Sequence, residues 1–259
     1  FIKSKIRQKV TDPTTADKLT NIDHPYAAKR PPIDTHYFET FSKDHVKLVD
    51  LQVDPIAEIT RNGIALESGA HHNLDVIVFA TGYDAMTGPL LNLNIETPKS
   101  SLKSYWEEGP KNYLGLAIPG FPNLFTITGP GSPSVLSNMP VSIEQHVDWI
   151  TECIAHCIEN GCTAIEAQEQ SAEIWTDHVR ETANATLLPK VKHSWYLGAN
   201  IPGKPRVFMP YAGGLNMYRK ICNNIAEEGY RGFDLNSESV RETSKPLVFT
   251  TSGDFLLGV

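Results

Sequence analysis

The chain has 259 residues, of which 41% are hydrophobic and 20% are charged, and its formal net charge is −7. This balance is typical of a folded chain with one large or two modest domains and excludes an intrinsically disordered class. The negative charge argues against a nucleic-acid-binding face, which needs concentrated Lys and Arg, and no apolar run reaches membrane-spanning length. No signal-peptide pattern opens the chain, so we expect a cytoplasmic protein.

The four cysteines favour free thiols over a disulfide framework in a chain of this length. Cys153, Cys157 and Cys162 lie close together in sequence, but no second cluster of Cys or His completes a metal site. We therefore expect buried thiols in a reducing compartment and no zinc chemistry.

The first twenty residues predict two short helices, the second opened by Asp12 as N-cap and Pro13 at the first helical position. A basic connector interrupted by prolines, "HPYAAKRPPID" (residues 24–34), follows. Lys29 and Arg30 within it are either a solvated surface pair or a basic pair held in place by stiff backbone. In the second case the arginine could stabilise a developing oxyanion and the lysine could meet a phosphate.

Several strands are expected next. Residues 47–50 predict a short strand, and alternation around Asn62-Gly63 predicts a hairpin with a type I′ turn. The apolar run Leu74–Ala80 predicts a buried strand that ends in Ala-Thr-Gly, and Leu124–Thr128 predicts a second one.

Three amphipathic helices occupy the remaining chain. The first has capping-box spacing at Ser142 and Gln145, carries Ile143, Val147, Ile150 and Ile154 on one face, and stops at Gly161. The others are predicted over residues 166–183 and 215–228. Strands separated by helices indicate an α/β fold, in which ligands bind beyond the carboxyl ends of strands.

The loop "GPGSPS", residues 129–134, matches only half of the dinucleotide fingerprint G-x-G-x-x-G. Pro130 and Pro133 have no backbone N–H to offer a diphosphate, and Ser134 replaces the third glycine. We reject a diphosphate loop. What remains is either a plain strand-to-helix turn or a stiff turn that lets backbone approach a flat group such as a flavin.

Five blocks occur in the order of one known family: "AKRPPIDTHYFETF", "DVIVFATGYDAMTG", "GPKNYLGLAIPGFPNLFTITGPGSPSVLSNM", "SIEQHVDWI" and "SWYLGANIPGKPRVF". From about Ile6 to Leu235 the chain resembles the C-terminal half of flavin-dependent Baeyer–Villiger monooxygenases. The resemblance implies an incomplete form of a fold with two dinucleotide-binding domains. Its parts would be the end of a helical insertion (1–28), the NADP-domain end (29–81), the FAD-domain end (82–236, control loop near 193–206) and a tail of unknown structure (237–259).

The resemblance further implies an activity. FAD and NADPH would be the cofactors, ketone and O₂ the substrates, and one oxygen atom would enter next to the carbonyl through a C4a-peroxyflavin, giving an ester or lactone. Two alternatives remain: a related N- or S-oxygenating flavin monooxygenase, and a non-catalytic remnant of the fold.

Site residues follow from the matched blocks. Arg30 resembles the catalytic arginine that stabilises the negatively charged adduct, and Lys29 resembles a contact to the 2′-phosphate of NADP. Thr81, Gly82 and Asp84 would pass beside the cofactors, where small residues let backbone lie near bound nucleotide.

The remaining candidates lie in two loops. The resemblance places Gly131, Ser132 and Met139 beside the flavin, and it gives Val135, Leu136 and Met139 to the ketone pocket. Trp195 is either a core aromatic or, as the resemblance implies, a mobile residue that folds over NADP and substrate.

The family's two glycine fingerprints and its active-site aspartate do not occur in these residues. Because the chain opens on Phe1, we expect the missing N-terminal half of the protein upstream. We expect that this chain alone is inactive and binds neither cofactor tightly.

Overall fold

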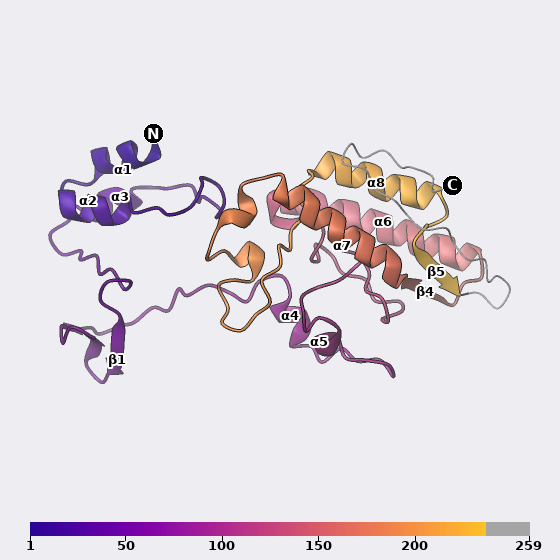
Figure 1. The fold of residues 1–259 in the computed structure, drawn as a ribbon, viewed down its shortest axis with the longest axis horizontal. Coiled ribbons are helices and arrows are strands. Elements are labelled where there is room, and N and C mark those ends of the chain that lie inside the picture. Colours follow the sequence, from indigo (N-terminus) through magenta and orange to yellow (C-terminus); the bar gives the residue numbers. More distant parts are fainter. Residues whose placement is uncertain (237–259) are drawn as a thin grey trace. The chain divides into compact units, whose positions relative to one another are not determined.

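A computed structural model describes residues 1–236; the expected tail of residues 237–259 lies outside them. The chain divides into two compact units, whose residues can be followed by the sequence colours of Figure 1. The first comprises Phe1–His24 and Arg30–Gly82, and the second comprises Pro25–Lys29 and the chain from Tyr83 onward. The prolines of the connector thus belong to different units.

The first unit opens with two helices, as the sequence predicts. They are α1 (Ile2–Lys9) and α2 (Pro13–Leu19), and a single turn, α3 (Tyr37–Thr40), follows. The N-cap Asp12 accepts a hydrogen bond from the Thr15 amide at 2.7 Å, which confirms the predicted start of α2. A small core formed by Ile6, Val10 and Ala16 joins these helices.

A three-stranded antiparallel sheet forms the rest of the first unit: β1 (Ile56–Thr60), β2 (Gly63–Leu66) and β3 (His71–Asn73). The predicted hairpin is confirmed, but the type I′ turn is wrong. The loop between the paired Thr60 and Gly63 is Arg61-Asn62, and neither has the positive φ that this turn requires. Gly63 instead lies against β3, where a Cβ would come within 1.9 Å of the His72 carbonyl oxygen.

The other two strands predicted for this region do not form. Residues 47–50 and 74–80 pair with no strand among the described residues. Val76, Val78 and Phe79 are 75%, 82% and 68% exposed, instead of buried. A strand is stable only when neighbours accept its backbone hydrogen bonds and cover its faces, and residues 1–236 supply neither.

The second unit contains most of the helical structure. Its longer helices, α6 (Met139–Glu159), α7 (Glu169–Asn184) and α8 (Leu215–Glu227), lie side by side (Figure 1). Its shorter elements are α4 (Gly88–Leu91), α5 (Leu102–Tyr105), η1 (Ser134–Leu136), η2 (Leu188–Lys190), η3 (Trp195–Leu197), and the antiparallel strands β4 (Ala164–Ala167) and β5 (Phe233–Asn236). The core between the long helices includes Trp149, Trp175 and Tyr218, all almost fully buried. The predicted helices over 166–183 and 215–228 are confirmed within a few residues.

Helix α6 differs from its prediction in start and orientation. It begins at Met139, where the Asn138 side chain accepts a hydrogen bond from the Val141 amide, so Ser142 lies inside the helix and the predicted capping box is wrong. The buried face carries Ser142, Gln145, His146, Trp149, Cys153 and Cys157. The aliphatic stripe is exposed instead: Ile143 is 38%, Val147 42% and Ile154 44% exposed. The predicted stop is confirmed by Gly161, whose φ is +67°.

Two strand assignments in the second unit need correction. Leu124–Thr128 forms only an isolated bridge, between Phe125 and Ala117, and not a buried strand. Strand β4 falls at the predicted start of the α7 helix and was not expected. Its partner β5 is about seventy residues further along the chain, so no local pattern marks the pair.

Two further observations concern the cysteines and the length and polarity of the helices. Cys153, Cys157 and Cys222 are buried, Cys162 is partly buried, and all four are free thiols, as expected. Within residues 1–236, the helices are too short or too polar to cross a bilayer.

Candidate functional site

In the loop of residues 129–134, the four central residues 130–133 leave no backbone N–H free for a diphosphate. The Gly131 amide donates to the Met209 carbonyl oxygen at 2.6 Å, and the Ser132 amide donates to the Gly129 carbonyl oxygen at 3.1 Å. Pro130 and Pro133 have no N–H. The loop is therefore a closed, internally bonded turn, which agrees with the rejection of a diphosphate loop.

The glycine at position 131 has a structural explanation. Its φ is +88°, and a Cβ there would lie 3.0 Å from the indole nitrogen of Trp175. That nitrogen donates a hydrogen bond to the Gly131 carbonyl oxygen at 3.1 Å. Trp175 lies in the amphipathic helix predicted over residues 166–183, but the sequence analysis gave it no role in supporting this loop.

A buried histidine lies directly before the loop. The Thr128 amide donates to Nδ1 of His146 at 2.9 Å, and Thr128 has the unusual φ of +54°. Burial lowers the pKa of His146 from its usual 6.5 to about 4, because the charged form loses its hydration. His146 is thus neutral near pH 7 and holds Thr128 as an acceptor. Sequence reasoning assigned it no role.

Segment 83–86, which follows the Ala-Thr-Gly turn, is fastened by the predicted control loop. The Asn200 side chain donates to the Tyr83 carbonyl oxygen at 3.1 Å. Lys204 forms an ion pair with Asp84 and donates to the Ala85 carbonyl oxygen at 3.3 Å. These contacts join segments more than a hundred residues apart, and sequence reasoning missed both Asn200 and Lys204 although they lie in a matched block.

The same segment also reaches the loop before α6. Met86, at a φ of +68°, has its sulfur 3.6 Å from the Ser134 hydroxyl oxygen, which donates to it. The second unit therefore brings Asp84, the 129–134 loop and the control loop together. Ser132 itself is fully buried and its hydroxyl donates to the Gly129 carbonyl oxygen at 2.8 Å.

The predicted ketone-pocket residues and Trp195 share one apolar cluster. Val135, Leu136 and Trp195 are each partly buried against Tyr196, Leu197, Phe208 and Ala183. Met139 lies nearby in sequence, as the partly buried first residue of α6. Trp195 stands in the short helix η3, with its ring 4.5 Å from that of Tyr196, so it lies at the edge of a core and not in an open loop.

Lys29 is held near Trp195 through its neighbour. The Ser194 hydroxyl donates to the Ala28 carbonyl oxygen at 3.5 Å, and both residues are buried. Lys29 itself is partly buried and belongs to the second unit. A half-buried cation at this position could hold a phosphate beside the control loop.

The remaining predicted residues belong to the first unit. Arg30, Thr81 and Gly82 are exposed there. Open space surrounds Gly82, whose φ is +91°, so this turn leaves room for a ligand beside the backbone.

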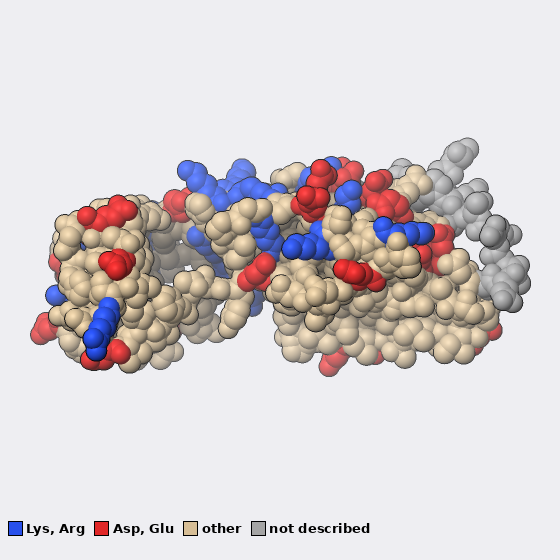
Figure 2. Space-filling model, turned by 90° about the horizontal axis from the view of Figure 1, so that it is seen from below, with Lys and Arg blue, Asp and Glu red and all other residues tan. Residues whose placement is uncertain are grey.

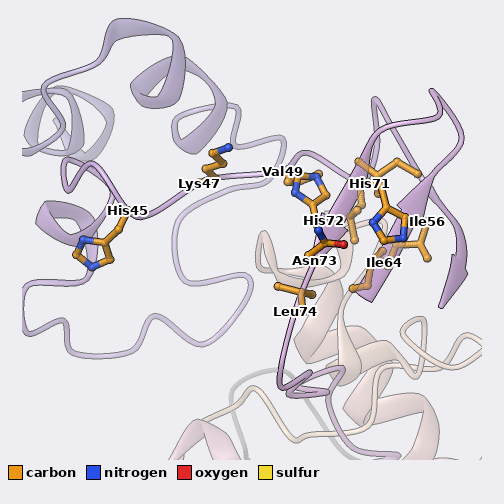
Figure 3. A pocket seen from close by; sticks show the side chains of 11 residues that line it. His45, Lys47, Val49, Ile56, Ile64, His71, His72, Asn73 and Leu74 are labelled. Carbon is orange, nitrogen blue, oxygen red and sulfur yellow. The ribbon is translucent and has the colours of Figure 1, made fainter. Parts of the chain in front are cut away.

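The first unit also carries a hollow of about 610 Å³ beside its hairpin (Figure 3). Apolar side chains such as Ile56, Ile64 and Leu74 line it together with His45, His71 and His72. His71 lies 3.1 Å from the Thr60 hydroxyl oxygen. Within residues 1–236, no three His, Cys, Asp or Glu side chains converge as metal ligands would, so the histidines of this mixed apolar and polar hollow do not form a metal site.

The charge distribution does not form a continuous basic surface on the face drawn in Figure 2. Basic and acidic side chains intermingle along the upper part of the second unit in this view, and its lower part is largely uncharged. This pattern suits small-molecule chemistry better than a phosphate backbone.

Comparison with known proteins gives close matches over most of the chain. The chain is 42% identical over 236 residues to cyclohexanone 1,2-monooxygenase of Acinetobacter sp. and 43% identical over 231 residues to a Baeyer–Villiger monooxygenase of Pseudooceanicola batsensis. It is also 42% identical over 239 residues to a phenazine N-monooxygenase of Lysobacter antibioticus. These matches cover about nine-tenths of this chain but only 42–43% of each relative, so the chain spans less than half their length. No family profile matches the chain.

Comparison with solved structures identifies the same kind of enzyme. Cyclohexanone monooxygenase from Rhodococcus sp. Phi1 bound to NADP⁺ superposes with a TM-score of 0.87 at 39% identity, over 92% of this chain and 44% of that one. A complex of OTEMO with FAD and NADP gives a TM-score of 0.86 at 38% identity, over 91% and 43%. The predicted α/β class and the partial flavoprotein fold are thereby confirmed. The chain is homologous to monooxygenases of the Baeyer–Villiger type, and its fold corresponds to the C-terminal portion of theirs.

Proposed function

We propose that this chain is the C-terminal part of an FAD- and NADPH-dependent monooxygenase that inserts one oxygen atom from O₂ next to a ketone carbonyl. The observation that carries the proposal is the junction in the second unit. There Lys204 of the control loop contacts Asp84 and Ala85, and Met86 accepts a hydrogen bond from Ser134 of the 129–134 loop. Trp195 packs in the same apolar cluster as Val135 and Leu136. Loops from three distant parts of the chain thus share one place, as a site for two cofactors and a substrate requires.

The described residues fit the edges of these cofactors but not their diphosphates. No N–H of residues 130–133 is free, so this loop does not suit a diphosphate, and we propose that another part of the protein holds both. Lys29 suits the 2′-phosphate that distinguishes NADP from NAD, and the start of α6 at Met139 offers a positive helix end to an electron-rich ring edge. When bound, the cofactors would supply the electrons and the activation of O₂.

In this scheme the chain contributes binding, water exclusion and one fixed charge. Val135, Leu136 and Met139 would line the ketone site, and Trp195 would cover it and keep water out. Arg30 would stabilise the oxyanion that develops on the substrate oxygen.

Exposed apolar surfaces support a further polypeptide. Val76, Val78 and Phe79 in the first unit, and Ile143 and Val147 on α6, are exposed although their sequence pattern is that of buried residues. Burial of such surface contributes about 25 cal/mol for each Å². We propose that the N-terminal half of the same protein covers them, and that this chain alone is inactive.

Flavin binding tests the proposal. The purified chain mixed with FAD should retain no yellow flavin after gel filtration. Co-expression with the N-terminal part of Acinetobacter cyclohexanone monooxygenase should restore bound flavin and ketone-dependent NADPH oxidation with ester as product. Arg30→Ala should then abolish ester formation while flavin stays bound, whereas Arg7→Ala in α1 should not. An assembly that oxidises NADPH but forms no ester from any ketone would contradict the proposed reaction.

One alternative has its own support. The phenazine N-monooxygenase matches this chain as well as the cyclohexanone enzyme does. Supplying the assembly with a ketone and an aromatic amine together, and identifying both products, distinguishes carbon–carbon insertion from N-oxygenation. If flavin never binds, in the assembly or alone, the non-catalytic remnant is the better description.

We also propose the cytoplasm as the place of action. Four unpaired thiols, three of them buried, suit a reducing compartment. Fractionation of the native host cells, followed by detection of the protein with an antibody, checks this.

A further inference from the structure

A second pocket, here called the Trp175 pocket, lies in the second unit behind the 129–134 loop. Its volume is about 430 Å³, within the range of small-molecule sites. It is bounded by residues 108–112, the C-terminal half of α7 and residues 206–209. Of the residues assigned above to cofactor or ketone, only Gly131 lines it, together with Leu197 and Arg206 of the predicted control loop.

The floor of this pocket is apolar. The Trp175 indole, Val179, Leu197, Phe208 and Met209 form it, and each is at least nine-tenths buried. Such a floor favours an apolar ligand body, because contact removes hydrocarbon surface from water.

The rim of the pocket is positively charged in a chain whose net charge is −7. Lys111, Arg180 and Arg206 line it, against a single acid, Glu108. Asp177 pairs with Arg180 at 2.8 Å and offsets that charge, which leaves an excess of about one positive charge. Arg206 donates to the backbone carbonyl oxygens of Val191 and Lys192, which fix its position without neutralising it.

One wall of the pocket holds a buried donor without a partner. Asn112 is 3% exposed, and its Nδ2 has no hydrogen-bond acceptor among the described residues. Its Oδ1 is directed toward Gly131, 2.9 Å from the position that a Cβ would take there. A buried amide N–H without an acceptor costs about 1–3 kcal/mol. This Nδ2 has almost no exposed surface, so an acceptor oxygen on a ligand would recover that cost only after the Asn112 side chain turns toward the pocket.

From the apolar floor, the cationic rim and this orphan donor, we infer that the Trp175 pocket binds a small monoanion with an apolar body, of the arylcarboxylate class. The carboxylate lies toward the cationic rim, and the hydrocarbon body lies on Trp175. Because Trp175 donates to Gly131 and Gly131 donates to Met209, an occupant contacts both residues that hold the 129–134 loop from behind.

Fluorine NMR tests this on the chain itself, without flavin, NADP or ketone. The chain is labelled with 5-fluorotryptophan, which gives one signal for each of its four tryptophans, and Trp175→Phe assigns one of them. Benzoate should shift the Trp175 signal saturably at concentrations up to about 10 mM. Benzyl alcohol should bind at least about tenfold more weakly, and benzylamine should not compete.

Two variants locate the charge and the donor. Lys111→Glu should weaken benzoate binding by at least about tenfold, whereas Lys103→Glu, the same change on α5 outside the pocket, should not. Asn112→Leu should also weaken it. Fluorine spectra without ligand show whether each variant keeps the native signal positions.

Three results would overturn the inference: no saturable shift, equal binding of benzoate and benzyl alcohol, or equal effects of the two lysine variants. Since no step needs the monooxygenase reaction, failure here and failure of the proposed function are separate outcomes.

Discussion

The two units of this chain differ in how completely each one buries its apolar residues. The second unit buries a connected core around Trp149, Trp175 and Tyr218 between three long helices. The first unit buries Ile6, Val10 and Ala16 between two short helices, and leaves the most apolar stretch of the chain, residues 74–80, largely exposed. The helices predicted from the sequence form in both units, whereas the buried strands predicted over residues 74–80 and 124–128 do not form.

The difference lies in where the partners of each element are. Helices satisfy their own backbone and need only one covered face, which α6, α7 and α8 give one another. A buried strand depends on neighbours for both its hydrogen bonds and its faces, and residues 1–236 offer none to residues 74–80. An exposed segment with the sequence pattern of a buried strand therefore indicates that the neighbours it needs are not among residues 1–236.

The largest expected effect tests the core of the second unit. Trp175→Ala should lower the free energy of unfolding of that unit by about 3–5 kcal/mol, because it empties a fully buried site and removes the hydrogen bond to Gly131. Urea unfolding followed by circular dichroism measures this. Phe79→Ala, an aromatic truncation in the exposed segment of the first unit, should change stability by less than about 0.5 kcal/mol. Equal losses would remove the contrast between the units.

The next effect is a pH dependence confined to the second unit. The pKa of His146 falls from 6.5 to about 4 on folding, so the unfolded chain binds the proton more tightly and stability falls as pH drops from about 6.5 to about 4. The loss amounts to roughly 3 kcal/mol over that window. His146→Asn keeps an acceptor for the Thr128 amide but cannot titrate, so its urea midpoint should lose this slope. His193→Asn, at an exposed histidine, should keep it.

A smaller loss is expected in the first unit. Ile6→Ala removes a 4% exposed side chain from a core of few residues and should cost about 2 kcal/mol, at the low end for such truncations. Hydrogen exchange of the amides in α1 and α2 measures it locally. Lys5→Ala, at an exposed neighbour, provides the control. Unchanged protection in the Ile6 variant would show that these helices do not depend on their shared core.

The smallest stability effect sharpens the role of the exposed segment. Val78→Lys should change the free energy of unfolding by no more than about 0.5 kcal/mol, since the side chain is 82% exposed. It should nevertheless reduce aggregation in light scattering, because a charge on an unpaired apolar segment blocks edge-to-edge pairing. In the proposed assembly with an N-terminal half, the same change should prevent flavin binding. Full assembly with the lysine present would contradict burial of this segment.

Local patterns predicted the elements whose signals are local. Asp12 with Pro13 marked a helix start, alternation around Asn62-Gly63 marked the hairpin, and Gly161 marked a helix end, and the structure contains all three. The face of α6 was harder, because its sequence carries two stripes. The more apolar one, with Ile143 and Val147, is exposed.

The contacts that the sequence did not predict join residues that are far apart along the chain. The pairing of β4 with β5, the hydrogen bond between Ser194 and Ala28, and the ion pair of Lys204 with Asp84 join residues 66 to 166 positions apart. No periodicity within a window of twenty residues contains such information. The matched blocks predicted which loops line the site, but only the structure showed that Trp175 contacts Gly131 and that His146 contacts Thr128.

The hydrogen bond between Ser194 and Ala28 also explains why Lys29 and Arg30, although adjacent, belong to different units. It anchors residues 25–29 to the helical unit, and the boundary between the units falls at the next peptide bond. Under the proposed roles, Lys29, which would distinguish NADP from NAD, belongs to the second unit. Arg30, which would serve oxygen transfer, belongs to the first unit. Exchange of residues 30–82 among homologues would therefore transplant the arginine and its surroundings while nucleotide preference stayed behind.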